Sequence, residues 1–126
     1  MAKEMPRELK LLRYWTNLLG LQDWRIVLET DVKPENMELS NADGCISYEE
    51  VVKAAKIQII DKNLREPSLQ PFDFEETLVH ELLHIKFCLL ERGKKWEKKL
   101  QLRLLHQYVD DLARALVSAK HYKEKQ

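Results

Sequence analysis

The chain has 126 residues, 44% of them hydrophobic, which suits one compact domain around a single core over residues 1–126. Its 21 acidic and 21 basic side chains give a formal net charge of zero. No overall electrostatic attraction therefore favours nucleic acid or an anionic membrane surface. We expect neither as a partner.

Cysteine usage and apolar runs bear on the compartment. Cys45 and Cys88 lie far apart and form no CxxC pair, which argues against a disulfide framework and for two free, buried thiols in a reducing compartment. Residues 1–10 contain no apolar run of signal-peptide length, and no stretch approaches the roughly 20 apolar residues that span a bilayer. We expect a soluble, cytoplasmic protein.

The N-terminal third predicts a helix, a strand and a loop. Apolar residues recur at helical spacing over residues 6–20, where a proline suits the first turn and a glycine can end the helix. Alternation of period two over residues 24–28 predicts a strand with one buried face. Residues 33–43 contain a proline, two asparagines and a serine, and we predict a loop there with a short strand at residues 37–39.

Two further strands are predicted over residues 45–48 and 54–61, because apolar and polar side chains alternate there. Residues 49–53 would form the turn of a hairpin between them. Together with the earlier segments, they predict a small mixed sheet of three or four strands.

Two helices are predicted after the sheet. Asp73 can cap a helix, and Glu76, three residues later, can return the bond. That helix should run to about residue 90, Gly93 should break it, and a last, long helix is predicted over residues 94–120. Its apolar stripe comprises Leu102, Leu105, Val109, Leu112, Ala113 and Leu116. The element order predicts an α+β fold.

The first of these two helices contains the sequence His80-Glu81-Leu82-Leu83-His84. Residues four apart share one helix face, so His80 and His84 can bind one ion at about 2 Å from each nitrogen. Glu81 is offset toward the edge of that face and can reach a metal-bound water without binding the metal. The pattern predicts a zinc site with Glu81 as the catalytic residue.

The motif also has an ordinary interpretation. In a chain of this composition it arises by chance in on the order of one sequence in a hundred, and both histidines could simply bond to backbone or water. The setting favours the metal, because the motif lies mid-helix in an apolar segment where a buried polar pair needs a partner.

A catalytic zinc site has three protein ligands and one open position. Cys88 and Glu91 lie roughly 6 and 10 Å beyond His84 along the helix axis, too far to share the ion. His106 is the one ligand-type residue in the apolar stripe of the last helix, and we expect it to point at the core as the third ligand. The alternative is a core histidine bonded to a backbone carbonyl.

Asp110, one turn after His106, lies on the flank of the same stripe. It could accept a hydrogen bond from His106 or another ligand and fix that ring's orientation. A solvated helix acid is the alternative. Glu97 and Asp111 fall off the stripe and are weaker candidates.

These residues resemble the small single-domain zincins, sometimes called minigluzincins, and more loosely the compact HExxH peptidases of bacteria and their prophages. The resemblance covers roughly residues 24–116 and rests on the HELLH motif, the YVDDLARAL segment and the order helix, three strands, two helices. It implies a zincin-like fold, a Zn²⁺ cofactor and hydrolysis of peptide bonds.

In that family the last helix usually supplies a glutamate ligand just ahead of a Val-x-x-Leu-Ala pattern, which begins at Val109 here. His106 stands where we expect that glutamate, which implies a three-histidine site of His80, His84 and His106. The family also lays its substrate as an extra strand along an edge of the sheet, for which residues 44–49 and 54–60 are the options.

The predicted function is zinc-dependent hydrolysis of a peptide or protein substrate. Zinc would lower the pKa of a bound water toward about 7, and Glu81 would take its proton and deliver it to the leaving amine. A second group usually steadies the oxyanion. Tyr48, Tyr108 and His121 are candidates, although Tyr108 is more simply a rim residue and His121 part of a polar tail.

The alternative function is a non-catalytic interaction or regulatory protein with a zincin fold, of phage or repressor-system origin. It is supported by the short chain after His106, which leaves little sequence to wall a substrate cleft. A third possibility is a helical scaffold in which HELLH is accidental.

Overall fold

The computed structural model describes residues 5–68, 70–87 and 98–125. Its elements are α1 (Arg7–Leu18), β1 (Arg25–Val32), a 3-10 turn (Pro34–Asn36), β2 (Gly44–Glu49), β3 (Ala54–Ile60), α2 (Phe74–Lys86) and α3 (Lys98–Glu124). The predicted element order and the α+β class are confirmed. Among the helices described, none has the length and apolarity to cross a membrane.

The sheet has the strand order β1-β3-β2. β3 pairs in parallel with β1 and antiparallel with β2, so the sheet is mixed and has β1 and β2 at its edges. β2 and β3 form the predicted hairpin. Since β3 is central, β2 is the free edge among the two strands considered for substrate.

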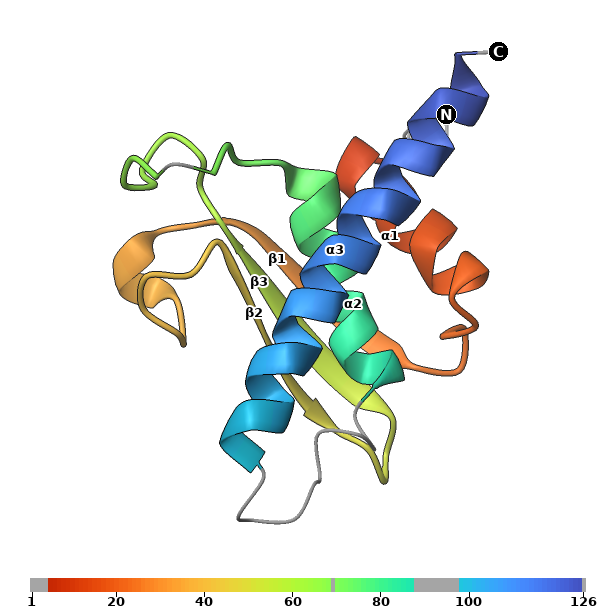
Figure 1. The fold of residues 1–126 in the computed structure, drawn as a ribbon, viewed down its shortest axis with the longest axis horizontal. Helices are drawn as coiled ribbons and strands as arrows, with labels where there is room; N and C mark the ends of the chain where they lie inside the picture. Colours follow the sequence, from red (N-terminus) through yellow and green to blue (C-terminus); the bar gives the residue numbers. More distant parts are fainter. Residues whose placement is uncertain (1–4, 69, 88–97, 126) are drawn as a thin grey trace.

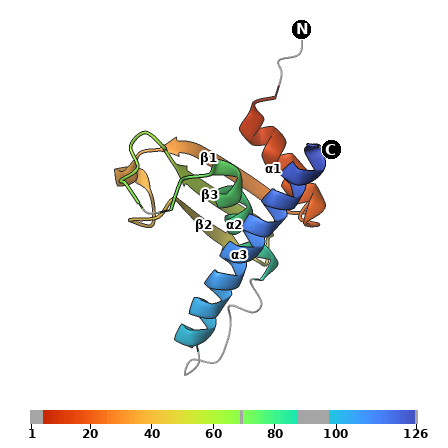
Figure 2. The same cartoon turned by 45° about the horizontal axis from the view of Figure 1, so that its top comes forward.

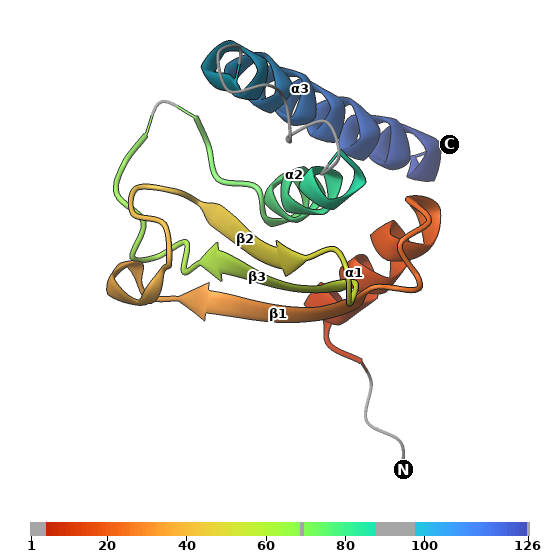
Figure 3. The same ribbon diagram turned by 90° about the horizontal axis from the view of Figure 1, so that it is seen from below.

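Three layers stack on one another, with α2 in the middle (Figure 3). The sheet covers one side of α2, α3 crosses the other side, and α1 lies beside the C-terminal half of α3 (Figures 1 and 2). Leu78, Val79 and Leu82 of α2 are 0% exposed, as are Ile57 and Ile59 of β3. The helix that carries HELLH is therefore the centre of the core.

The short strand predicted at residues 37–39 is wrong, and the sheet has three strands. Residues 37–39 have no regular secondary structure and follow a 3-10 turn over Pro34–Asn36. The backbone N–H of Glu38 then donates to Oε1 of Gln58 (2.8 Å), and the Gln58 amide donates to the carbonyl of Asn36 (3.2 Å). One buried side chain on β3 thus supplies the bonds that a neighbouring strand would have supplied.

α2 ends at Lys86, earlier than the predicted end at about residue 90, and the Phe87 N–H caps it by bonding to the Leu83 carbonyl (3.0 Å). Residues 88–97 lie outside the described part of the chain. The predictions for Cys88, Glu91, Gly93, Glu97 and the start of the last helix fall there.

The buried side of α3 differs from the predicted stripe. Val109, Ala113 and Val117, spaced four residues apart, face α2 and are at most 4% exposed. Leu112 is 38% exposed, because it lies about 100° around the helix from Ala113. The prediction that Leu112 belongs to the core is therefore wrong.

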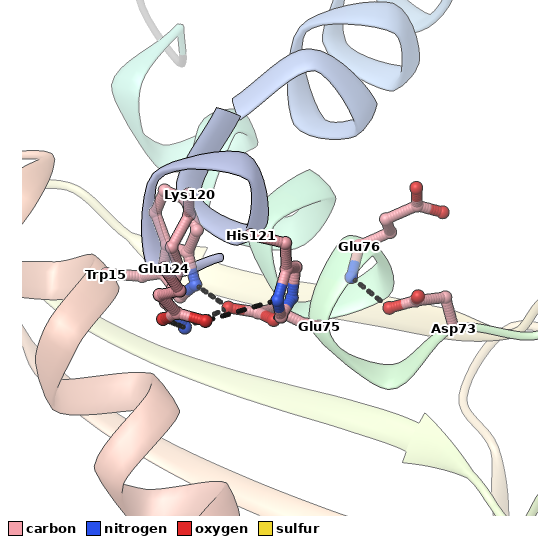
Figure 4. A network of polar contacts seen from close by, with 7 residues as sticks. All are labelled: Trp15, Asp73, Glu75, Glu76, Lys120, His121 and Glu124. Atoms are coloured by element: carbon pink, nitrogen blue, oxygen red, sulfur yellow. Dashed lines mark hydrogen bonds and ion pairs between the residues drawn. The ribbon is translucent and has the colours of Figure 1, made fainter. Parts of the chain in front are cut away.

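A buried carboxylate joins all three helices near the start of α2 (Figure 4). Glu75 is 2% exposed and accepts hydrogen bonds from Trp15 Nε1 of α1 (2.7 Å), and from Lys120 Nζ (2.6 Å) and His121 Nε2 (2.8 Å) of α3. The Lys120 ammonium also lies 4.6 Å from the centroid of the Tyr14 ring. One side chain of α2 thus holds both α1 and α3.

Burial alone would raise the pKa of Glu75, but the hydrogen bonds from Lys120, Trp15 and His121 outweigh burial and hold the pKa below its ordinary value of 4.5. A carboxylate whose pKa is lowered by folding stabilises the fold above its unfolded-state pKa. That contribution is lost as the pH falls from 4.5 through the folded-state value.

We expect Glu75→Gln to lower the free energy of unfolding by about 3 kcal/mol at neutral pH, because Lys120 then keeps a largely buried charge without its counter-ion. The difference from wild type should shrink as the pH falls below 4.5, where the carboxylate becomes protonated. Urea unfolding over a pH series measures both. Glu35→Gln in the exposed 3-10 turn is the control and should change stability by less than about 0.5 kcal/mol. A loss of stability that is equal at every pH would contradict the role of Glu75 as an ionised carboxylate.

Candidate metal centre

α2 begins at a capped turn. The Asp73 carboxylate accepts a hydrogen bond from the Glu76 N–H (2.9 Å), as predicted. The Glu76 carboxylate points away from Asp73 and does not return the bond, contrary to the prediction (Figure 4). The Thr77 hydroxyl instead donates to the Asp73 carbonyl (2.8 Å). This cap fixes where the helix starts, and so the direction in which its later histidines project.

His80 and His84 lie one turn apart on α2 and face the same way. Their Nε2 atoms are 3.2 Å apart and their ring centroids 4.9 Å apart. His84 is 6% exposed, and the side chain of His80 is 20% exposed. The structure thus brings together the two imidazoles of the motif at the edge of the core.

α3 brings His106 to the same point. Its ring centroid lies 4.6 Å from that of His84 and 5.7 Å from that of His80, and one ligand atom from each histidine lies within 4.8 Å of the others. Within the described ranges, no other group of three His, Cys, Asp or Glu residues could share an ion.

The expectation that His106 points into the core is wrong, because this side chain is exposed. The side of α3 that buries Val109 and Ala113 against α2 extends past the core at His106 and overhangs an open cleft. The same helix face therefore serves packing in one half of α3 and the candidate site in the other.

The spacing of the His80 and His84 imidazoles fits two ligands of a tetrahedral ion. Zn–N bonds of about 2.0–2.1 Å place two ligand nitrogens about 3.3–3.4 Å apart, close to the 3.2 Å between His80 Nε2 and His84 Nε2. One N–H···N hydrogen bond would also bring two rings this close, but it would not require a third imidazole beside them. Three nitrogen ligands with a side open to a cleft suit zinc.

His80 is held in the form that binds metal. Burial, reinforced by the neighbouring His84, lowers the pKa of His80 below its ordinary value of 6.5, against the opposing attraction of Asp110. A histidine binds metal through a neutral ring nitrogen. The His80 ring is therefore available as a ligand at neutral pH.

Asp110 lies against a candidate ligand, and that ligand is His80 rather than His106. Its Oδ1 is 3.3 Å from His80 Nδ1, and its Oδ2 accepts a hydrogen bond from Arg114 (2.6 Å). A carboxylate on Nδ1 fixes the ring and directs Nε2 toward the ion. The side chain of Asp111, one residue later, is 75% exposed. Its Oδ1 lies 3.8 Å from the Arg114 guanidinium.

Glu81 lies against the start of edge strand β2. It is 6% exposed and lines the same cleft as the histidines. Gly44 allows this approach, because a Cβ there would lie 2.7 Å from Thr77 Cγ2 and 3.1 Å from Glu81 Oε2. The missing side chain at Gly44 therefore lets the Glu81 carboxylate reach its position.

A cleft of about 600 Å³ runs between β2 and the two helices. Its lining includes the three histidines, Glu81, Asp110 and Arg114, and from β2 the residues Gly44, Cys45, Ile46 and Tyr48. The free edge of the sheet and the candidate metal centre thus border one open space.

Of the three residues considered for steadying an oxyanion, only Tyr48 lines the cleft, where its ring packs edge-on against Trp24 at 6.4 Å. Tyr108 is 69% exposed, and since it follows His106 by two residues it points to the opposite side of α3. His121 is bound to Glu75 instead. Tyr108 and His121 are therefore set aside.

Cys45 is a free, buried thiol, as predicted. It donates to Gln58 Oε1 (3.3 Å), and burial raises the pKa of the thiol. It therefore stays protonated at neutral pH, and it does not belong to the three-residue group that could hold an ion.

Sequence reasoning missed three residues that shape the cleft. Gly44 and Arg114 line it, and Arg65 holds Asp43 through two hydrogen bonds (2.6 and 3.2 Å) at the entry to β2. Arg114 could have been found from its spacing of four residues to Asp110. Gly44 and Arg65 act on segments distant in the chain, and no local pattern marks them.

Comparison of the chain with protein family models, curated proteins and solved structures found no match. Its function is therefore inferred from the site itself.

We expect Asp110→Ala to weaken zinc binding by about 10- to 100-fold, because the His80 ring loses the group that orients it. Competition against a chromophoric chelator measures the dissociation constant. Asp111→Ala removes the same charge one residue away and should leave the constant within about twofold of wild type. Equal effects of the two substitutions would show that Asp110 acts only through overall charge.

Proposed function

We propose that the chain is a zinc metallopeptidase with a zincin-like fold, in which His80, His84 and His106 hold Zn²⁺ and Glu81 is the catalytic residue. The observation that carries this proposal is the convergence of three imidazoles from two helices, beside a buried glutamate, in an open cleft. Structural zinc sites have four protein ligands, whereas catalytic sites keep one position open. Three ligands facing a cleft support the catalytic kind.

When bound, zinc would polarise a peptide carbonyl and lower the pKa of a water in the open position toward about 7. The Glu81 carboxylate, seated beside Gly44, would take a proton from the attacking water and pass it to the leaving amine. Asp110 would keep the His80 ring turned toward the ion. Tyr48, on the cleft wall, is the remaining candidate donor to the substrate oxyanion.

An extended peptide or protein segment is the proposed substrate. β2 is an edge strand and lines the cleft, and an extended peptide adds to such an edge through main-chain hydrogen bonds. Gly44–Glu49 is therefore the proposed substrate-binding edge. The reduced thiol of Cys45 supports a cytoplasmic location.

Glu81→Gln tests the proposal, because an amide cannot take up the proton. We expect the variant to keep one zinc per chain and to lose peptide cleavage by about 10²- to 10⁴-fold. A pooled peptide library is incubated with the protein in H₂¹⁸O, so that each hydrolysis places ¹⁸O in a new C-terminal carboxylate that mass spectrometry detects. Elemental analysis counts zinc. Glu35→Gln, which removes an exposed carboxylate outside the cleft, should cleave like wild type.

A variant as active as wild type would exclude Glu81 as the catalytic residue, and a wild-type chain without zinc would exclude the metallopeptidase. A zinc-loaded wild-type chain that places ¹⁸O in no peptide would instead support the non-catalytic interaction protein.

A further inference from the structure

α3 carries a second apolar stripe on the side that faces away from the molecule. Tyr108 and Tyr122 are 69% and 68% exposed, and Leu112 is 38% exposed. Between them Ala115 and Ala119 are exposed as well. α3 is the outermost layer of the fold, and the described residues leave this side uncovered (Figure 3).

The stripe has the repeat of a coiled-coil seam, because its five residues are spaced four, three, four and three positions apart. At about 100° per residue they span a strip about 80° wide. Val109, Ala113 and Val117, which face α2, lie about 140° around the helix from the middle of that strip. The stripe is therefore a surface of its own and not the margin of the core.

We propose that a second copy of the chain packs on this stripe through its own α3, antiparallel to the first, as a two-fold symmetric dimer. In that arrangement Ala115 of one subunit lies opposite Ala119 of the other, so the helices can approach closely. On each side of this central alanine contact, Leu112 of one subunit packs on Tyr122 of the other. The seam buries Leu112 and Tyr122, which the monomer exposes.

The charges beside the stripe select the antiparallel orientation. Asp111 and Lys125 lie two heptads apart along one margin of the stripe, and both are exposed. Equivalent margins face each other in an antiparallel pair, so Asp111 of each subunit meets Lys125 of the other, twice per dimer. A parallel pair would place Asp111 beside Leu116 and give neither charge an opposite charge on the other helix. Opposed helix dipoles favour the same orientation.

The dimer leaves the cleft open. His106, Asp110 and Arg114 project about 200° around α3 from the stripe. Dimerisation and zinc chemistry are therefore independent, and either can fail without the other.

Sedimentation of the full-length chain over a concentration series tests the dimer, which should approach twice the chain mass of 15.0 kDa. Ala115→Glu places a charge in the middle of the seam and should raise the dimer dissociation constant at least about 100-fold. The far-UV circular dichroism should not change, because position 115 is exposed in the monomer. Gln107→Glu adds the same charge about 100° away from Tyr108 and should dimerise like wild type.

A charge exchange tests the orientation. Asp111→Lys and Lys125→Asp should each weaken the homodimer by about tenfold, because like charges then meet twice. Mixing the two variants restores both ion pairs in a heterodimer, which should bind within about threefold of wild type.

A wild-type chain that stays monomeric at its highest soluble concentration would overturn the proposal and leave the stripe to a helix of another protein. If Ala115→Glu dimerised as tightly as wild type, the stripe would not be the dimer interface. Single charge variants that dimerise as tightly as their mixture would overturn the antiparallel arrangement.

Discussion

Enclosure of α2 on both sides is the constraint on which the site depends. The sheet and α3 together bury Glu75, Glu81 and His84 of α2. A buried polar group without a partner would cost free energy. At the start of α2, Trp15 and Lys120 compensate Glu75 and fasten the neighbouring helices to it. Further along, the cleft opens beside Glu81 and His84, which line it together with His80 and His106. Stability and chemistry thus lie at successive turns of one helix.

The course of α3 across α2 determines what the inward face of α3 contacts along its length. Where α3 crosses α2, that face packs Val109 and Ala113 into the core. Beyond the crossing it presents His106 to the cleft. The outward face, with Ala115 at its middle, remains free for a second subunit. One helix therefore combines packing and a candidate metal ligand on its inward face with a candidate interface on its outward face.

The sequence predicted most of what depends on spacing within one element. The four-residue interval between His80 and His84, the Asp73 cap and the β2–β3 hairpin are local patterns, and the structure contains all three. His106 was predicted as the third ligand beside the motif. Its exposure was not predicted, because burial depends on how far α3 extends past α2. The close approach at Gly44 joins β2 to α2 across distant segments, so nothing in the neighbouring sequence signals it.

X-ray absorption at the zinc edge of the purified chain tests the three-histidine site most directly. The site predicts one zinc per chain with nitrogen or oxygen neighbours at about 2.0–2.1 Å, the scattering pattern of three imidazoles, and one imidazole fewer in His106→Ala. A sulfur neighbour at about 2.3 Å, a spectrum unchanged in His106→Ala, or a chain that binds no zinc would contradict it.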